Sequence, residues 1–145
     1  MSPAERLARR LFRVFVRANI VLYRWSGGAV GGRLRGAPVL LLTTTGRRSG
    51  LPRTTPLLYL VEGDALALVA SNGGSPAHPA WFLNLEASPD VAVQVRRERR
   101  QMRAHRAAPE ERERLWPKLL ALYPPYESYQ RRTSREIPVV VLEPR

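Results

Sequence analysis

A short polar connection after an apolar run carries the residues in this chain that are best suited to hold an anion. Residues 38–42 are apolar, residues 43–50 read TTTGRRSG, and Arg53 follows closely. Glycines let successive backbone N–H groups turn toward one point, and a guanidinium group can bind phosphate or carboxylate through two parallel hydrogen bonds. The pattern is not a P-loop, which needs Gly-Lys-Ser/Thr. Two interpretations stand at this point: an anion site, or a polar β-hairpin turn with solvated arginines.

A second candidate site lies where two adjacent glycines would let a flat ligand approach backbone amides. Residues 71–74 read SNGG, and residues 79–84 (PAWFLN) add an aromatic body and an amide to the same part of the sequence. Trp81 and Phe82 are alternatively core residues, as aromatic side chains usually are. His78 lies in a stretch rich in glycine and proline, and it is interpreted as a solvated loop residue.

Three tyrosines recur at three-residue spacing in the C-terminal part of the chain, at Tyr123, Tyr126 and Tyr129. On a helical or 3₁₀ turn this spacing places them on one side, where their hydroxyl groups would line an apolar surface. The alternative is a packed C-terminal cap whose hydroxyl groups reach water.

The composition excludes several kinds of chemistry. The chain has no cysteine, which rules out disulfides, thiolate metal sites and a cysteine nucleophile. His78 and His105 are too few and too far apart for a histidine-based metal cluster, so we expect no metal. Ser49 has no histidine near it in the sequence. If the protein is an enzyme, we therefore expect a cofactor to perform the reactive step while the protein binds and orients it.

The charge balance points to an anionic partner. The 145 residues include 24 lysines and arginines against 12 aspartates and glutamates, a formal net charge of +12. Such a field favours a phosphorylated ligand, a membrane surface or nucleic acid. Because no recognition-helix, RNP or zinc pattern is present, we expect no specific nucleic-acid partner.

The first 25 residues predict a basic amphipathic helix. Residues 2–5 (SPAE) read as a capping box with proline at the first helical position. Apolar residues recur at three- and four-residue spacing as far as Trp25, and arginines fill much of the remaining circumference. Glycines at positions 27, 28, 31 and 32 are expected to stop the helix and form a flexible joint. The helix either contacts an anionic membrane surface or packs on its own barrel with its arginines in water.

Neither a bilayer-spanning run of ~20 apolar residues nor a signal-peptide cleavage pattern is present. We therefore expect a cytoplasmic protein, with peripheral attachment to the inner face of the cell membrane through residues 1–25 as the membrane alternative. Both a monomer and a dimer are compatible with the sequence.

From residue 37 onward the spacing of apolar residues changes from the helical three- and four-residue pattern to one typical of β-strands. We expect strands at about residues 38–45, 52–61, 65–71, 91–95, from a charged tip at 96–100 to 107, and 137–142, with helical segments at 80–86 and 109–122. This pattern predicts an α+β, mainly β, fold: a six-stranded antiparallel split β-barrel with an N-terminal amphipathic helix and two or three short helices. Residues 1–35 form the helix and glycine hinge, and residues 36–145 the cofactor-binding barrel.

Taken in order, these segments resemble the deazaflavin-dependent nitroreductase family, split β-barrel oxidoreductases that use coenzyme F420. The resemblance rests on residues 41–50 (LLTTTGRRSG), 70–74 (ASNGG), 78–81 (HPAW), 123–130 (YPPYESYQ) and 136–140 (EIPVV). It extends from about residue 36 to the C-terminus, and the ordered set is far more specific than any single piece. Leu58 and Asn72 depart from it, because other members can carry tyrosine and lysine there.

The resemblance implies hydride transfer from reduced F420 to a small-molecule acceptor that is quinone-like, nitroaromatic or an activated alkene. Tyr126 would close over the reacting face, with the other catalytic candidates being Ser71, Tyr123 and Tyr129. The phosphate and acidic tail of F420 would be held by Arg47, Arg48, Ser49 and Arg53. The deazaflavin ring and the rest of the groove would be lined by Thr54, Thr55, Pro56, Leu57, Leu58, Val69, Ala70, Ser71, Asn72, Ala80, Trp81, Phe82, Leu83, Asn84 and Tyr126.

Two alternative functions stay open at this stage. FMN, less favoured than F420, would make the protein a flavin-dependent reductase of the same fold. A non-catalytic F420- or fatty-acid-binding protein would use the same groove without a reaction.

Overall fold

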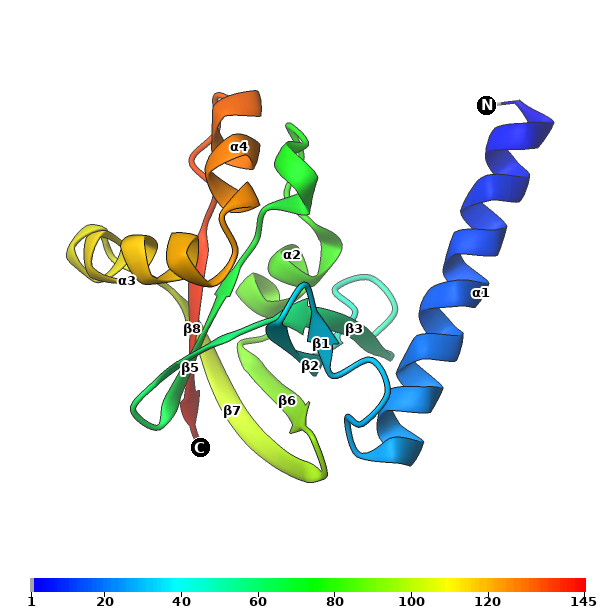
Figure 1. Cartoon of the computed structure of the whole chain (residues 1–145), viewed down its shortest axis with the longest axis horizontal. Coiled ribbons are helices and arrows are strands. Elements are labelled where there is room, and N and C mark those ends of the chain that lie inside the picture. Colours follow the sequence, from blue (N-terminus) through cyan, green and yellow to red (C-terminus); the bar gives the residue numbers. More distant parts are fainter. Residues whose placement is uncertain (1) are drawn as a thin grey trace.

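A curled antiparallel sheet forms the body of the protein, with α1 to one side and the other helices around it (Figure 1). The computed structural model describes residues 2–145. The strands are hydrogen-bonded in the order β1-β2-β6-β7-β8-β5-β4, and β3 also pairs with β2. The eight strands are β1 (Arg33–Leu34), β2 (Ala37–Thr45), β3 (Pro52–Leu58), β4 (Leu60–Glu62), β5 (Ala65–Val69), β6 (Asp90–Val95), β7 (Glu98–Arg106) and β8 (Val139–Pro144).

Four helices and one 3₁₀ turn complete the described part of the chain. They are α1 (Pro3–Ser26), η1 (Asn72–Gly74), α2 (Ala80–Ala87), α3 (Pro109–Leu122) and α4 (Pro125–Arg132). The mainly β, antiparallel class expected from the sequence is therefore confirmed, with the N-terminal helix in its expected place.

The expected count of six strands is wrong, for two reasons. The expected strand at residues 52–61 is divided at Tyr59, because β3 pairs with β2 whereas β4 pairs with β5. β1 has only two residues, too few for a hydrophobic period to be read in the sequence, and it pairs with the start of β2. The charged tip expected at residues 96–100 is also shorter, since Val95 already pairs with Glu98.

The uninterrupted apolar run in β2 is explained by burial on both faces. Leu40 and Leu42 belong to the main core inside the curled sheet, together with Phe82 of α2. Val39 and Leu41 point to the opposite side, where they pack with Tyr23 of α1. Side chains alternate between the faces of a strand, so a strand covered on both faces needs apolar residues at every position.

A second core cluster joins β5 and β8 to the C-terminal helices. Val69, Val139 and Val141 pack there against residues of α3 and against Tyr126 of α4. Burial of this face fixes α4 beside η1, which Figure 1 shows at the upper end of the molecule. The tyrosines of the C-terminal segment are thereby brought next to the 71–74 turn.

The N-terminal helix begins with the expected capping box. Ser2 Oγ accepts a hydrogen bond from the Glu5 N–H, and the Glu5 carboxylate accepts one from the Ser2 N–H. At the other end Gly27 adopts a left-handed conformation with a φ of 63° and ends the helix. Within residues 2–145 no helix combines the length and the apolar character needed to cross a membrane.

Tyr23 attaches the last turns of α1 to the sheet. Its side chain is only 1% exposed. The hydroxyl group donates toward the carbonyl oxygens of Val39 and Gln94, at 2.9 and 3.2 Å, and accepts from the Arg96 N–H at 2.8 Å. One phenol therefore links α1 to β2 and to the β6–β7 turn.

Candidate functional site

A groove of about 680 Å³ lies between the 46–53 connection, β3, the η1 turn and the start of α2. Three guanidinium groups line it, those of Arg47, Arg48 and Arg53, and no aspartate or glutamate among residues 2–145 does. Apolar surface comes from Leu57, Val69 and Trp81. The groove thus combines a cationic part, suited to an anion, with an apolar part suited to a flat ring.

Asn84 fixes the arginine-rich connection from beneath. Its Oδ1 atom accepts hydrogen bonds from the Arg47 backbone N–H at 3.1 Å and from the Arg47 guanidinium at 3.2 Å. Its Nδ2 atom donates to Thr44 Oγ1 at 3.3 Å. Because Asn84 is 4% exposed, this amide holds Arg47 in place at the groove wall.

The connection itself is a compact turn. The Gly50 N–H donates to the Gly46 carbonyl oxygen at 2.8 Å, and Ser49 Oγ accepts from the Leu51 N–H at 3.2 Å and from Arg53 Nη2 at 3.4 Å. A Cβ on Gly46 would lie 2.6 Å from Ser49 Oγ, so any larger residue there would displace this hydroxyl from its place in the turn.

The second wall of the groove is the strained η1 turn. Asn72, Gly73 and Gly74 are three successive residues with positive φ values of 46°, 63° and 82°. A Cβ on Gly74 would lie 2.8 Å from the carbonyl oxygen of Tyr129, which means that α4 packs directly on this turn. The glycines therefore permit both the left-handed backbone and the close approach of the tyrosine helix.

A second, more apolar cavity of about 670 Å³ adjoins the groove. It lies between α1, β2, β3 and the tyrosines of the C-terminal segment. Both cavities are lined by Leu57, Val69, Ser71 and Gly73. A ligand in the groove and a ligand in the apolar cavity would therefore both contact this shared wall.

The tyrosine triplet forms one face of the apolar cavity, as its spacing predicts. The Tyr123 and Tyr126 rings lie 5.0 Å apart, and Tyr129 is 6.4 and 6.3 Å from them. Burial, followed by the proximity of Tyr123 and Tyr129, raises the pKa of Tyr126 well above its ordinary value. The Tyr126 phenol therefore keeps its proton and can act as a hydrogen-bond donor.

Most of the predicted site residues come together at these two cavities. The groove is lined by Arg47, Arg48, Ser49, Arg53, Thr54, Thr55, Leu57, Val69, Ser71, Asn72, Ala80, Trp81 and Asn84. The apolar cavity takes Pro56, Leu58, Tyr123, Tyr126 and Tyr129, together with shared Leu57, Val69 and Ser71. Leu58 and Asn72, which both depart from the family pattern, thus line different cavities.

Three predicted groove residues lie behind the walls. Ala70 and Phe82 are fully buried, and Leu83 packs against the main core. The two positions between Trp81 and Asn84 on α2 do not reach the groove, whereas Asn84 and Trp81, which also packs against the main core, border it. For Phe82, the core alternative is the one that the structure supports.

His78 is not the solvated loop residue that the sequence indicates. Its ring packs on Phe82, with centroids 4.8 Å apart, and its Nδ1 lies 3.1 Å from Arg135 Nη1. Because arginine has no acceptor, Nδ1 accepts this hydrogen bond and the histidine is neutral. Burial, with Arg135 and Arg106 nearby, lowers the pKa of His78, and Glu86 opposes this.

Sequence reasoning missed the part of the site that α1 contributes. Phe12, Phe15, Val16 and Asn19 line the apolar cavity from the helix side. The apolar stripe of the helix was visible in the sequence, but the cavity that it faces depends on how α1 docks. Arg24 of the same helix donates to Thr54 Oγ1 at 3.2 Å, so α1 also reaches a groove residue. Among residues 2–145, no cluster of histidine and carboxylate side chains could hold a metal ion.

Comparisons with known proteins agree with this geometry. A family model described as F420H(2)-dependent quinone reductase matches residues 15–144. An F420H(2)-dependent quinone reductase of Mycobacterium tuberculosis is 43% identical over 146 residues, which cover 98% of each chain. A solved domain-swapped dimer, 36% identical, gives a TM-score of 0.71 over 98% of this chain and 100% of that chain. A solved F420-H2 dependent reductase, 43% identical, gives 0.68 over 73% of this chain and 94% of that chain.

Proposed function

Because this chain belongs to the F420H(2)-dependent quinone reductase family, we propose that its two cavities divide the reaction: the groove holds F420 and the apolar cavity holds the quinone. The protein is an F420H2-dependent oxidoreductase. Membership of this family favours F420 over FMN as the cofactor, and an enzyme over a non-catalytic binding protein. Membership of the family does not by itself say which role each side chain has in binding or in the reaction.

The residues of the groove fit F420. This cofactor carries a phosphodiester and a glutamate tail, and the planar guanidinium groups of Arg47, Arg48 and Arg53 would bind those anions. The ring would lie against Leu57, Val69 and Trp81. When bound in its reduced form, F420 supplies the hydride. The protein therefore needs no nucleophile, and its task is to orient two rings and exclude water.

The shared wall is the observation that carries the proposal. Ser71 lines both cavities, and in the described part of the chain neither its hydroxyl nor that of Tyr126 has a hydrogen-bond partner. Both hydroxyls are thus available to a ligand. Tyr126, held protonated by its raised pKa, would donate a hydrogen bond to the quinone oxygen as that oxygen gains charge.

Anaerobic mixing with F420H2 and menadione tests the reaction, with cofactor oxidation followed by absorbance. We expect oxidation that depends on both protein and quinone. Fluorescence titration then measures F420 binding. Arg53→Ala should weaken this binding, and the size of the loss should depend strongly on the salt concentration. Arg131→Ala is the matched control, because the Arg131 side chain is 73% exposed, pairs with Glu127 on α4 and lines neither cavity. Absence of F420 binding by the wild-type protein would overturn the assignment.

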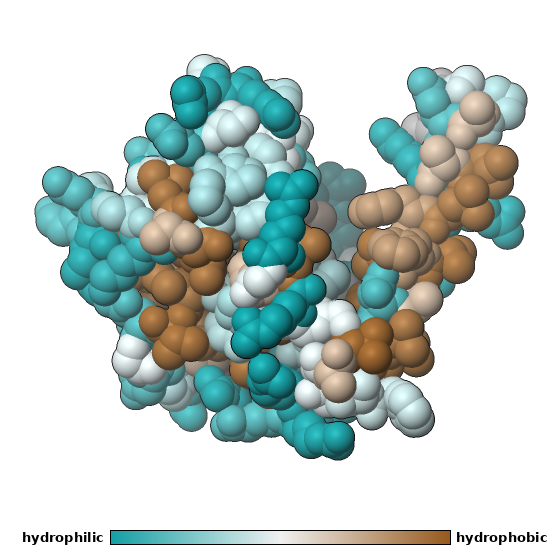
Figure 2. Space-filling view, viewed as in Figure 1, coloured by the Kyte–Doolittle hydropathy of each residue, from teal (hydrophilic) through white to brown (hydrophobic). Residues whose placement is uncertain are grey.

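We further propose that α1 attaches the protein to an anionic lipid surface. Its apolar side chains are unusually exposed for a folded protein, with Phe12 66%, Phe15 65% and Trp25 82% accessible. Figure 2 shows this hydrophobic surface along α1. Residues 2–25 also carry six arginines against one glutamate, a balance that complements anionic headgroups. A quinone dissolved in the lipid would then enter the apolar cavity beside Phe12 and Phe15.

Vesicle sedimentation tests this attachment. We expect binding to phosphatidylglycerol vesicles, weaker binding to phosphatidylcholine, and loss of binding in Trp25→Ser and in the double variant Arg9→Glu, Arg13→Glu. These residues do not line the apolar cavity, so turnover of menadione in the absence of vesicles should be preserved. If light scattering instead shows a stable dimer that Trp25→Ser dissociates, a second copy covers this face and the lipid proposal is wrong.

A further inference from the structure

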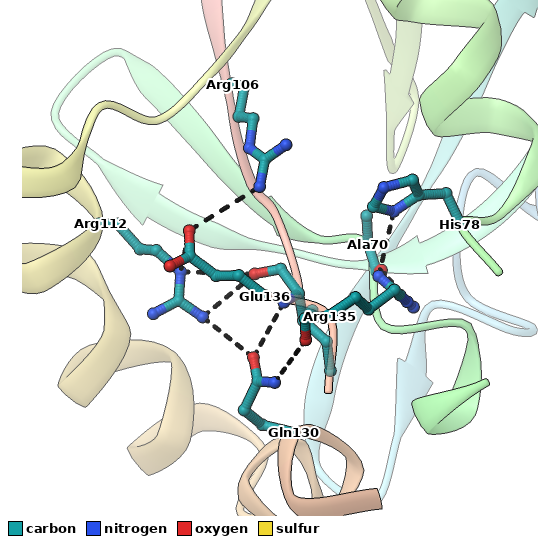
Figure 3. A network of polar contacts seen from close by, with 8 residues as sticks. Ala70, His78, Arg106, Arg112, Gln130, Arg135 and Glu136 are labelled. Atoms are coloured by element: carbon teal, nitrogen blue, oxygen red, sulfur yellow. Dashed lines mark hydrogen bonds and ion pairs between the residues drawn. The ribbon is translucent and has the colours of Figure 1, made fainter. Parts of the chain in front are cut away.

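Arg135 binds the backbone on which the groove wall is built (Figure 3). Its Nε atom donates to the Ser75 carbonyl oxygen at 2.9 Å, and its Nη2 atom donates to that of Ser71 at 2.8 Å. Nη1 donates to the Ala70 carbonyl oxygen at 3.3 Å and to His78 Nδ1 at 3.1 Å. A single guanidinium therefore holds both ends of the turn that contains η1.

This turn needs external support. Its three residues with positive φ include Asn72, for which the left-handed region is unfavourable compared with glycine. Two backbone hydrogen bonds close the turn itself, from the Gly74 N–H to the Ser71 carbonyl oxygen and from the Ser75 N–H to that of Asn72. Asn72 Nδ2 and the Ala77 N–H add bonds to the Ala77 carbonyl oxygen and to Ser75 Oγ. Ser71, Asn72 and Gly73 all line the groove, so any relaxation of the turn would move the groove wall.

The same segment also holds the tyrosine helix. Gln130 of α4 donates through Nε2 to the Arg135 carbonyl oxygen at 2.8 Å and accepts through Oε1 from the Ile137 N–H at 2.9 Å. Figure 3 shows Gln130 on one side of this segment and Ala70 and His78 on the other. Arg112 of α3 donates to the Ile137 carbonyl oxygen at 3.1 Å and to Gln130 at 3.3 Å. Arg135 thus lies between the η1 turn and the helix that carries Tyr126 and Tyr129.

We propose that Arg135 is a positioning residue that fixes the η1 turn against α4, and thereby sets the groove wall and the tyrosine face relative to each other. It does not line either cavity itself. The proposal rests on the assignment of F420 to the groove. Its physical basis is the match of one planar fork of donors to four acceptors, which the single ammonium group of lysine cannot reproduce.

The test uses Arg135→Ala and Arg135→Lys, with Arg131→Ala as the matched control. Each protein is titrated with F420 and assayed with menadione. Both measurements are repeated with guanidinium chloride at about 20 mM and with sodium chloride at the same ionic strength. We expect at least tenfold weaker F420 binding in Arg135→Ala, with a lower kcat. Guanidinium, but not sodium, should restore part of both values in this variant alone. Arg135→Lys should show a smaller loss and no rescue.

Hydrogen exchange on the cofactor-free proteins supplies a second readout. Amides of residues 70–77 should exchange faster in Arg135→Ala and slow again with guanidinium, whereas β6 should be unchanged. Faster exchange throughout the protein without rescue would mean a merely structural arginine and overturn the proposal, as would F420 affinity within twofold of wild type in both variants. If the wild type does not bind F420, the functional assignment fails. The exchange experiment then still tests whether Arg135 fixes the η1 turn. If Arg135→Ala does not fold, Arg135→Lys decides: weaker F420 binding with faster exchange confined to residues 70–77 supports the proposal, whereas faster exchange throughout the protein or F420 affinity within twofold of wild type overturns it.

Discussion

A single oxygen atom, Asn84 Oδ1, accepts hydrogen bonds from both the backbone and the side chain of Arg47. The amide comes from α2 and the arginine from the connection after β2, so the contact joins two segments 37 residues apart. It converts a mobile cationic side chain into a fixed part of the groove, which lowers the entropic cost of binding an anion.

Asn84→Ala should therefore weaken F420 binding by about five- to tenfold, which is about 1–1.4 kcal/mol. It should also lower the free energy of unfolding by about 1–3 kcal/mol, because the Arg47 N–H loses its acceptor and the buried Thr44 hydroxyl loses its donor. Thr44→Val is the matched control, since it removes only the contact at Asn84 Nδ2. Fluorescence titration and urea unfolding measure the two effects. Equal F420 affinity in the two variants would contradict a role of Asn84 in holding Arg47.

Tyr126→Phe should separate catalysis from cofactor binding. The hydroxyl lines the apolar cavity and not the groove, so F420 affinity should be unchanged while kcat for menadione falls about tenfold or more. Because the pKa of Tyr126 is raised, wild-type kcat should not decline through ionisation of this group up to about pH 10. Steady-state kinetics across pH check both points, and an unchanged kcat in Tyr126→Phe would remove Tyr126 from the reaction.

Gly74→Ala should be far more harmful than Gly63→Ala. Both glycines have positive φ, 82° and 64°, so both substitutions carry a backbone strain of about 1 kcal/mol. Only at Gly74 would the new Cβ also meet backbone, at 2.8 Å from the Tyr129 carbonyl oxygen, while the space around Gly63 is open. We expect a further loss of about 1–3 kcal/mol for Gly74→Ala in urea unfolding. Similar midpoints for the two variants would show that α4 does not pack on the η1 turn as described.

Tyr23→Phe should loosen α1. The substitution removes the hydroxyl that bonds three backbone groups and should cost about 1–3 kcal/mol. Limited proteolysis should then cut within or just after α1 faster than in the wild type. Tyr59→Phe serves as control, because the hydroxyl of this buried tyrosine has no partner within residues 2–145. Equal protection of α1 in both variants would contradict the anchoring role of Tyr23.

His78 should make the protein less stable in mild acid. Its lowered pKa means that the folded state prefers the neutral ring, whereas the unfolded chain takes up a proton below about pH 6.5. Stability linked to His78 is therefore complete above that pH and is lost as the pH falls. Urea midpoints at pH 7.5 and 5.5 should differ more in the wild type than in His78→Gln, whose amide oxygen can still accept from Arg135. An equal difference in both proteins would exclude this linkage.

Local patterns in the sequence were sufficient to predict most elements. The capping box at residues 2–5 and the glycine end of α1 each depend on neighbours within a few positions, and the structure confirms them. The apolar stripe of β2 likewise indicated burial. The division at Tyr59 was not predictable in this way, because it reflects a change of pairing partner from β2 to β5.

The residue types alone indicated an anionic partner and, for an enzyme, a cofactor: three arginines with glycines lie in one connection, the net charge is strongly positive, and the chain has no cysteine. Only the tertiary structure decided which groups act together. Phe82 lies in the core while its neighbour Trp81 lines the groove, and Arg135 reaches across 64 residues to the Ser71 carbonyl oxygen. The physical reason is that composition and spacing fix what a side chain can bind, whereas the packing of β5, β8 and α4 fixes what lies within its reach.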